Sequence, residues 1–421
     1  MNIYIWMLTI GVVCASQVRY DNFKVHRVFP KSEDDVEALT KLQENPSYDF
    51  WTDGVGLNYT VDIMVPPHLE FNFKDFLCLK NLQSEIYIEN VQNLIDKERL
   101  SNKRADGPRS MGWLEYYELD EIYDWLDQLA VDHSDVVKVL TPGTSYEDRD
   151  IKGLHISYSA NNEDNTIYIE GGIHAREWIS SAVVTYIINE IITSEDPEVR
   201  RVVEQYDWYI FPLYNPDGFH YTKTTNRMWR KTRVPYDNCY GADPNRNFDY
   251  RWNTRNGASN NPCSETYAGP YPNSEREIAT MSEFVDKIHD RLVAYFSIHS
   301  YGQLLLLPFG HTKDHLGNYN ELVSIIIFAN TIKEVGTIGM EKLKTYYGTE
   351  YRVGNTAEIL YVATGTSTDW VKATYGTRIS YTYELRDTGS YGFILPPDQV
   401  LPSGIETFGS LVTILDEFAK R

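Results

Sequence analysis

Basic residues are scarce in this sequence. Its 421 residues include 39 lysines and arginines against 60 aspartates and glutamates, which gives a formal net charge of −21 at pH 7. A protein with this balance has no basic field to hold phosphate groups, so binding to nucleic acid or to an anionic membrane surface is not expected.

Long apolar runs are also missing. The first 16 residues, MNIYIWMLTIGVVCAS, are uncharged, and their apolar run is too short to span a bilayer and ends in small residues. This pattern is typical of a secretory signal peptide, although the usual basic start is absent, and we expect cleavage near Ala15 or Ser16. No later stretch approaches membrane-spanning length, so the mature protein is expected to be secreted and soluble.

Cysteine is the third scarce residue, with four copies. Cys14 would leave with the signal peptide, and Cys78 lies in the N-terminal third of the chain. Cys239 and Cys263 flank a stretch rich in loop-forming residues. In an oxidising compartment we expect these two to form a disulfide that contributes about 3 kcal/mol, which leaves Cys78 unpaired.

Apolar and aromatic residues are abundant enough for a core. Hydrophobic residues make up 42% of the chain, so disorder is not expected. The length favours one large domain with a smaller partner. Residues 17–100 alternate short strand-like runs with helical stretches, as in a compact α+β unit, and include a candidate glycosylation site at Asn58.

Residues 101–112, SNKRADGPRSMG, separate this unit from the rest of the chain. They are polar, contain glycine and proline, and include Lys103, Arg104 and Arg109. The stretch predicts an exposed linker that a trypsin-like protease could cut, with a plain interdomain linker as the alternative.

From residue 113 to residue 421, strand-like and helical stretches alternate. Residues 119–133 place apolar side chains at helical spacing, so an amphipathic helix is expected to open this larger domain. The alternation predicts an α/β fold with a mixed twisted sheet and helices on both faces.

A histidine and a glutamate three positions apart, His174 and Glu177, come shortly after two glycines in GGIHAREWIS. With 10 histidines and 60 acidic residues in the chain, such a pair is expected by chance. Its position is more informative, because it comes just after an apolar strand, where open α/β sheets build their sites. His299 follows another apolar strand and would supply a third ligand.

Two histidines and one carboxylate leave the fourth position of zinc for water, which is the arrangement of a catalytic site. We therefore predict one zinc ion per chain. His311 and His315 also have ligand-like spacing, but they lie among polar loop residues with no evident carboxylate on a rigid element nearby, so no metal role is expected for them.

Five longer motifs occur in order along the chain: HAREW, NRMWRK, DPNRNF, SIHSYGQLLLLP and YELRDTGSYGFILP. Together they resemble the secreted zinc metallocarboxypeptidases of the pancreatic and digestive type, the A/B subfamily. The resemblance covers residues 113–421, and residues 17–100 resemble the family's activation propeptide, a small α+β open sandwich. It implies a zymogen whose N-terminal domain covers the active-site cleft until proteolysis, and an enzyme that removes residues from the C-termini of peptides and proteins.

The resemblance also implies roles for individual residues. The family's zinc ligands match His174, Glu177 and His299, and a family aspartate that orients the first histidine matches Asp243. Glu384 matches the carboxylate that takes a proton from the metal-bound water.

Arg230 matches the arginine that stabilises the developing oxyanion. Arg246, with Asn245 beside it, matches the residues that recognise the free C-terminal carboxylate. Tyr361 matches a mobile tyrosine that closes over bound substrate. The residues that match outer substrate subsites are Arg176, Arg227, Tyr301 and Phe393.

Thr368 matches the family position at the base of the side-chain pocket, where an acid selects lysine or arginine and an apolar residue selects aromatic or aliphatic ends. With no charge there, and with Gly310, Ala363 and Thr382 leaving room, burial of an unpaired basic side chain would be costly. Asp369 matches an ordinary position outside the pocket base. We therefore expect A-type preference for aromatic or aliphatic C-terminal residues, with B-type specificity as the alternative.

A non-catalytic zinc-binding relative is a further alternative. Such a protein has no need of Glu384 or Arg230, and the sequence contains both, which favours an enzyme. Nothing in the sequence indicates more than a monomer.

Overall fold

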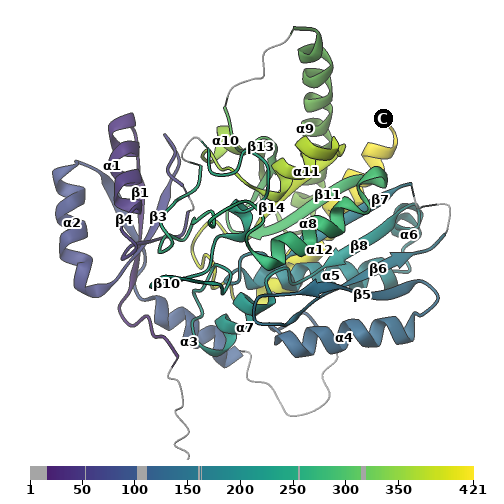
Figure 1. The fold of residues 1–421 in the computed structure, drawn as a ribbon, viewed down its shortest axis with the longest axis horizontal. Coiled ribbons are helices and arrows are strands. Elements are labelled where there is room, and N and C mark those ends of the chain that lie inside the picture. The colour runs from purple at the N-terminus through teal and green to yellow at the C-terminus, as the bar shows by residue number, and fades with distance from the viewer. Residues whose placement is uncertain are drawn as a thin grey trace, which may run out of the picture.

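The chain folds into a small α+β unit that packs beside a larger α/β unit (Figure 1). The predicted signal peptide and His315 lie outside the described residues, as does most of the predicted linker, residues 102–110. The computed structural model describes residues 17–52, 54–101, 111–159, 162, 164–254, 257–313 and 319–421.

The small unit contains a four-stranded antiparallel sheet in the order β2-β3-β1-β4. Helices α1 and α2 lie on its outer side (Figure 1), and α1 begins with a capping box in which the side chains of Ser32 and Asp35 accept each other's backbone N–H. The elements are β1 (Lys24–Phe29), α1 (Glu33–Gln43), β2 (Asp49–Phe50), β3 (Val61–Val65), α2 (Glu70–Leu79), β4 (Gln83–Ile88) and α3 (Val91–Ser101).

Strand β3 of this small sheet is buried on both of its faces. Ile63 of β3 packs with Phe73 of α2 on the outer face, whereas the neighbouring Met64 points to the opposite face and packs with Met228 and Phe393 of the larger unit. Because successive side chains of a strand alternate between faces, a strand that is buried along its whole length must be enclosed from both sides. The small unit is thus held against the larger one by the inner face of its sheet.

The larger unit contains an eight-stranded mixed sheet in the order β13-β12-β14-β11-β7-β8-β6-β5. The four central strands β14, β11, β7 and β8 run parallel, and antiparallel pairs occur toward the edges. The strands are β5 (Val137–Thr144), β6 (Asp150–Ser157), β7 (Thr166–Gly171), β8 (Asp207–Phe211), β11 (Leu292–Ser300), β12 (Leu304–Leu307), β13 (Arg352–Asn355) and β14 (Ile379–Leu385). A separate two-stranded ribbon pairs β9 (Pro235–Tyr236) with β10 (Cys239–Tyr240).

Side chains of the central strands enter two separate cores. On β7, Ile167 and Ile169 pack into the core that contains residues of α4, α5, α9 and α12. Tyr168 between them points to the other face and packs with residues of α8 and α11. The helices of this unit are α4 (Leu119–Asp132), α5 (Trp178–Thr193), α6 (Pro197–Val203), α7 (Pro216–Thr224), α8 (Arg276–Asp286), α9 (Tyr319–Tyr347), α10 (Thr356–Ile359), α11 (Ser367–Tyr375) and α12 (Val400–Ala419).

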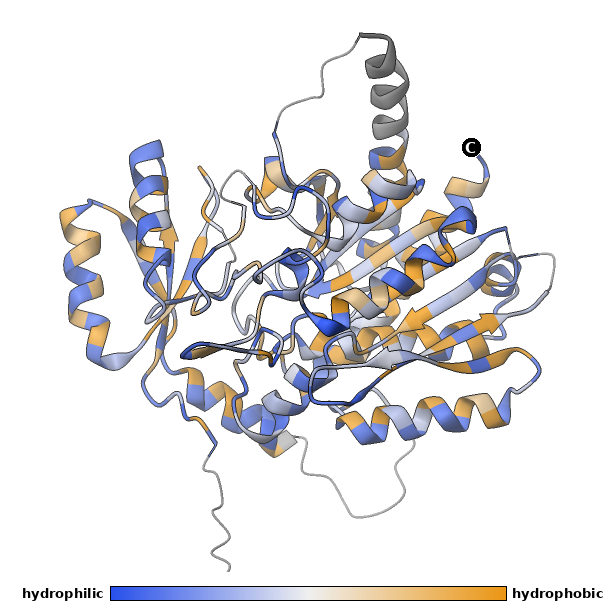
Figure 2. Ribbon diagram, in the orientation of Figure 1, coloured by the Kyte–Doolittle hydropathy of each residue, from blue (hydrophilic) through white to orange (hydrophobic). Residues whose placement is uncertain are grey.

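The predicted fold class, a mixed sheet with helices on both faces, is confirmed. Figure 2 shows central strands in which apolar residues alternate with less apolar ones, and a helix α4 that alternates apolar and polar residues along its length, as the predicted amphipathic helix does. Among the described residues no helix combines the length and the apolar character that a bilayer crossing requires.

Candidate metal centre and substrate cleft

The predicted metal ligands meet at the carboxyl ends of two neighbouring strands. Strand β7 ends at Gly171, His174 lies in the turn that follows, and Glu177 immediately precedes helix α5. His299 lies near the end of β11, which pairs with β7 in parallel. The turn requires glycine at Gly172, because its φ is +63° and an added Cβ would lie 2.6 Å from the Ser181 hydroxyl.

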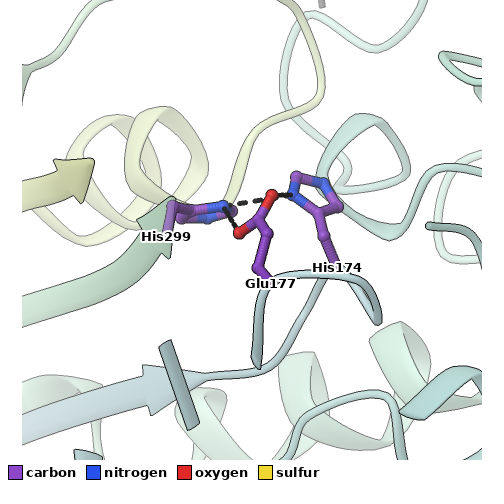
Figure 3. A group of neighbouring side chains, drawn as sticks. All are labelled: His174, Glu177 and His299. Atoms are coloured by element: carbon purple, nitrogen blue, oxygen red, sulfur yellow. Dashed lines mark hydrogen bonds and ion pairs between the residues drawn. The ribbon is translucent and has the colours of Figure 1, made fainter. Parts of the chain in front are cut away.

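The ligand atoms of these residues face one another (Figure 3). His174 Nδ1 lies 2.8 Å from Glu177 Oε1 and 3.1 Å from His299 Nδ1, and His299 Nδ1 lies 3.1 Å from Glu177 Oε2. All three side chains are buried, and their ligand atoms lie within 4.8 Å of one another. Burial opposes ionisation of Glu177, but the two imidazoles outweigh it and hold the pKa of this carboxyl below its usual range.

Asp243 orients the first histidine. The Nε2–H of His174 donates to Asp243 Oδ1 at 3.0 Å, which leaves the Nδ1 lone pair directed into the cluster. Asp243 Oδ2 accepts from Arg230 Nη2 at 2.7 Å. Although Asp243 is buried, the guanidinium groups of Arg230 and Arg246 hold its pKa well below the usual range.

This cluster has the donor chemistry of a catalytic zinc site. Two imidazole nitrogens and a carboxylate oxygen form the set that zinc prefers when one position is kept for water or substrate, and the bond to Asp243 presents the required tautomer of His174. When bound, zinc lowers the pKa of a bound water and polarises a carbonyl.

Glu384 and Arg230 lie beside the metal ligands. Glu384 is on β14 and is the register partner of His299 on the adjacent strand β11. Arg230 is buried, and its Nη1 lies 3.9 Å from Glu177 Oε1. Both residues line the same cavity as the three ligands.

This cavity also contains most of the other predicted substrate contacts. The resemblance implied residues that bind the terminal carboxylate, form the side-chain pocket, close over the substrate or contact it further out. Of these, the following line the cavity: Asn245, Arg246, Tyr301, Tyr361, Thr368 and Phe393. The predicted outer-subsite residues Arg176 and Arg227 do not line it. They are buried at its margin, where they contact the small unit.

The position predicted to form the base of the side-chain pocket carries no charge. The Thr382 hydroxyl donates to the Thr368 hydroxyl at 3.3 Å, and Ala363 lines the same cavity. The carboxylate of Asp369 accepts the N–H of Gly310 at 2.9 Å and that of His311 at 3.1 Å.

One expectation about His311 is wrong. A carboxylate on a rigid element does lie near it, since Asp369 belongs to helix α11 and its Oδ2 is 3.1 Å from His311 Nδ1. The sequence did not indicate this contact because the two residues are far apart in the chain. Within the described ranges these two residues do not belong to a set of three metal ligands.

The small unit covers the cavity with an aromatic contact and a close backbone approach. Trp51 lines the cavity, and its ring packs against those of Tyr301 and Phe393, with centroid separations of 6.4 Å and 5.3 Å. Gly54 lies against Tyr361 so closely that an added Cβ would be 2.4 Å from its ring. The side chain implied to close over substrate is therefore packed beneath the small unit.

Acidic residues of the small unit pair with the two marginal arginines. Asp49 accepts two hydrogen bonds from Arg176 Nη1, at 3.0 and 3.1 Å. Glu98 accepts from Arg227 Nε at 2.7 Å and from Nη2 at 2.9 Å, and both side chains are 1% exposed. Sequence reasoning missed Trp51, Asp49 and Glu98, because nothing in their local pattern indicates which distant residues they meet.

Two cysteine predictions are confirmed. Cys239 and Cys263 form a disulfide, and Cys78 is free and exposed. Asn58, the candidate glycosylation site, is also exposed.

Comparisons with known proteins agree with this geometry. A family model described as zinc carboxypeptidase matches residues 122–410, and one described as carboxypeptidase activation peptide matches residues 26–98. Zinc carboxypeptidase A 1 of Anopheles gambiae is 43% identical over 98% of this chain and 94% of the relative. Carboxypeptidase A1 of Mus musculus is 36% identical over 99% of both chains.

Solved structures show the same likeness. The crystal structure of carboxypeptidase A from Helicoverpa armigera has a TM-score of 0.85 at 26% identity and covers 96% of this chain and 99% of that one. That of thrombin activatable fibrinolysis inhibitor has a TM-score of 0.83 at 28% identity, with coverage of 96% and 100%.

The chain belongs to the zinc carboxypeptidase family. It is a zinc-dependent hydrolase of peptide C-termini that carries an activation peptide, so it is a zymogen that proteolysis activates. We refer to the small unit below as the propeptide.

Proposed function

We propose that the activated enzyme removes neutral C-terminal residues, with a preference for aromatic or aliphatic side chains. The observation that carries this proposal is the uncharged pocket base formed by Thr368 and Thr382. A lysine or arginine buried there would have no anionic partner, and burial of an unpaired charge is strongly unfavourable. B-type specificity would need an available acid, but the nearby Asp369 already accepts three hydrogen bonds from the backbone N–H groups of Gly310 and His311.

The other site residues have distinct proposed roles. Asn245 and Arg246 bind the substrate's terminal carboxylate, for which a guanidinium supplies paired donors. Arg230 stabilises the negative charge that develops on the scissile carbonyl oxygen, and Glu384 accepts a proton from the attacking water. Support for these roles comes from one cavity that all four residues share with the metal ligands.

Tyr361 is proposed to close over the bound substrate after activation. It belongs to the segment between α10 and α11, and in the zymogen it packs against Gly54 of the propeptide. Arg176, Arg227, Tyr301 and Phe393 are proposed to contact substrate residues upstream of the cut bond. The propeptide contacts all four residues, so before activation it would cover the surface that these residues offer to substrate. This supports the proposal.

We further propose that residues 1–16 direct secretion, that residues 17–100 form the activation domain and that residues 113–421 form the catalytic domain, a monomer. A trypsin-like protease would cut within residues 101–112, after Lys103, Arg104 or Arg109. The basic residues in a polar, glycine- and proline-containing linker support this choice of protease.

A panel of blocked dipeptides ending in Phe, Leu, Lys or Glu tests the specificity. After trypsin treatment we expect release of Phe and Leu but little release of Lys or Glu, and loss of all activity in a zinc chelator. The variant Thr368→Asp should shift preference toward Lys, whereas Thr345→Asp, at an exposed position of the catalytic domain, should not. Preferred release of Lys by the unaltered enzyme would contradict the proposed pocket, and chelator-resistant release would contradict the zinc mechanism.

A further inference from the structure

A buried glutamate lies outside the cleft but close to it. Glu170 is on β7, its side chain has no exposed surface, and it does not line the cavity. Its register partner on β11 is Ser297, two residues before the zinc ligand His299. Neither the proposed mechanism nor the resemblance gives Glu170 a role.

Glu170 is connected to the substrate site through one serine. The Ser367 hydroxyl donates to Glu170 Oε1 at 3.0 Å. The Ser367 backbone N–H donates to Asn245 Oδ1 at 2.9 Å, and Asn245 Nδ2 lies 3.4 Å from His299 Nε2. Ser367 begins helix α11, and the next residue is Thr368 at the pocket base.

Burial of an ionised carboxyl group at this position is energetically unfavourable. Burial raises the pKa of Glu170, although His299 and the hydroxyls of Ser297, Tyr295 and Ser367 act in the opposite direction. An aliphatic side chain of similar size would avoid the desolvation cost. The carboxyl group supplies one contact that an aliphatic side chain cannot make, the acceptor for the Ser367 hydroxyl.

This hydrogen bond helps to fix the position of the start of helix α11. Ser367 is held at two points, by Glu170 through its hydroxyl and by Asn245 through its backbone N–H. One bond ties the first turn of α11 to β7 and the other ties it to the segment that contains Asn245. The placement of this turn therefore affects both Thr368 and the Asn245 carboxamide. Loss of the hydroxyl bond would leave the turn with one of these two bonds.

We propose that Glu170 is a positioning residue for substrate binding, which acts through Ser367 to hold Thr368 at the pocket base and Asn245 at the carboxylate subsite. This inference rests on the roles proposed above for Thr368 and Asn245. Glu170 itself contacts neither the substrate nor the metal. Its removal should therefore weaken substrate binding more than it slows the chemical step.

The test measures kcat and KM of activated variants on a blocked dipeptide ending in Phe, together with zinc content and thermal unfolding. Glu170→Leu should raise KM roughly tenfold, as expected for loss of a buried hydrogen bond, with zinc content unchanged and a smaller effect on kcat. Glu170→Gln keeps an acceptor for Ser367 and should restore most of the affinity. If Glu170→Leu does not fold, Ser367→Ala removes the same bond and should raise KM in the same direction.

Glu277 provides the matched control. It is also a fully buried glutamate, on helix α8, which covers the same face of the sheet as α11, but it accepts the Tyr146 N–H and does not line the cavity. Glu277→Leu should reduce stability without raising KM. An equal KM increase in Glu277→Leu, or no rescue by Glu170→Gln, would overturn the positioning role.

Asn245→Ala separates this inference from the proposed function. If Asn245→Ala raises KM but Glu170→Leu and Ser367→Ala do not, the positioning role is wrong and the carboxylate subsite stands. If Asn245→Ala leaves KM unchanged, the subsite is wrong and the inference fails with it.

Discussion

His299 and Glu384 are register partners on the adjacent parallel strands β11 and β14. Side chains at paired positions of neighbouring strands project from the same face of a sheet, so a carboxylate is placed next to a metal ligand by the backbone pairing itself. The position does not depend on a flexible loop. This is the geometry that a general base beside a bound metal requires.

Glu384→Gln should therefore lower kcat by about 10²- to 10⁴-fold, the range for loss of a general base. The amide has nearly the same shape but does not accept the proton, so zinc content and KM should change little. Kinetics on a Phe-terminated dipeptide and metal analysis would measure this, with the exposed Glu350→Gln as the control. Near wild-type kcat in Glu384→Gln would rule out the proposed base.

Asp243→Asn should weaken zinc binding by about 10- to 100-fold, the usual effect of losing a partner that orients a ligand. The charged acceptor for His174 Nε2–H disappears, and Arg230 loses its ion pair at the same time. Competition with a chelator of known affinity measures the change. The exposed Asp249→Asn in the same segment should retain zinc as the unaltered enzyme does.

Glu98→Gln should release the propeptide faster once the linker is cut. The Glu98–Arg227 pair is buried, and removing one partner of a buried pair costs about 3 to 5 kcal/mol because the other charge loses its compensation. The delay between cleavage, seen on a gel, and the rise of activity should shorten. The exposed pair of Glu89 with Lys24 lies within the propeptide, so Glu89→Gln should leave the delay unchanged, and an equal effect of both variants would contradict the assignment.

Glu277→Gln should change how stability depends on pH. Burial raises the pKa of Glu277 from 4.5 to about 8. Below pH 4.5 both folded and unfolded chains hold the proton, whereas between about 4.5 and 8 only the folded chain does, so stability is lost as the pH rises through this window. Glu277→Gln should remove that loss in urea unfolding measured from pH 4 to 9, while the exposed Glu283→Gln on the same helix should preserve it.

Much of the fold was accessible from the sequence because the periodicity of its central elements is strong. The apolar runs of β7 and β11 and the helical spacing of α4 appear directly in the chain. The edge strand β5 was not predicted, since Pro142 and Gly143 interrupt its pattern. An edge strand tolerates these residues because only one side of it must pair.

Some residues of the site could likewise be predicted from local sequence, and others could not. The zinc ligands could be predicted because they lie at or just beyond the ends of two apolar strands, and a local turn brings His174 and Glu177 together. Glu384 required the resemblance, since nothing local distinguishes it among 60 acidic residues. Contacts such as Glu98 with Arg227 have a sequence separation of 129, and only the packed structure shows them.

The sequence by itself determined the metal chemistry, the sheet and the disulfide, because local patterns and short motifs carry that information. The tertiary structure decided which carboxylates lie beside which cations. It also decided that Asp369 is occupied by backbone donors and that Glu170 holds the first turn of α11 through Ser367. These outcomes depend on strand order and on packing between distant segments. They could not be predicted, because the local sequence around a charged residue does not indicate which distant residue it will contact.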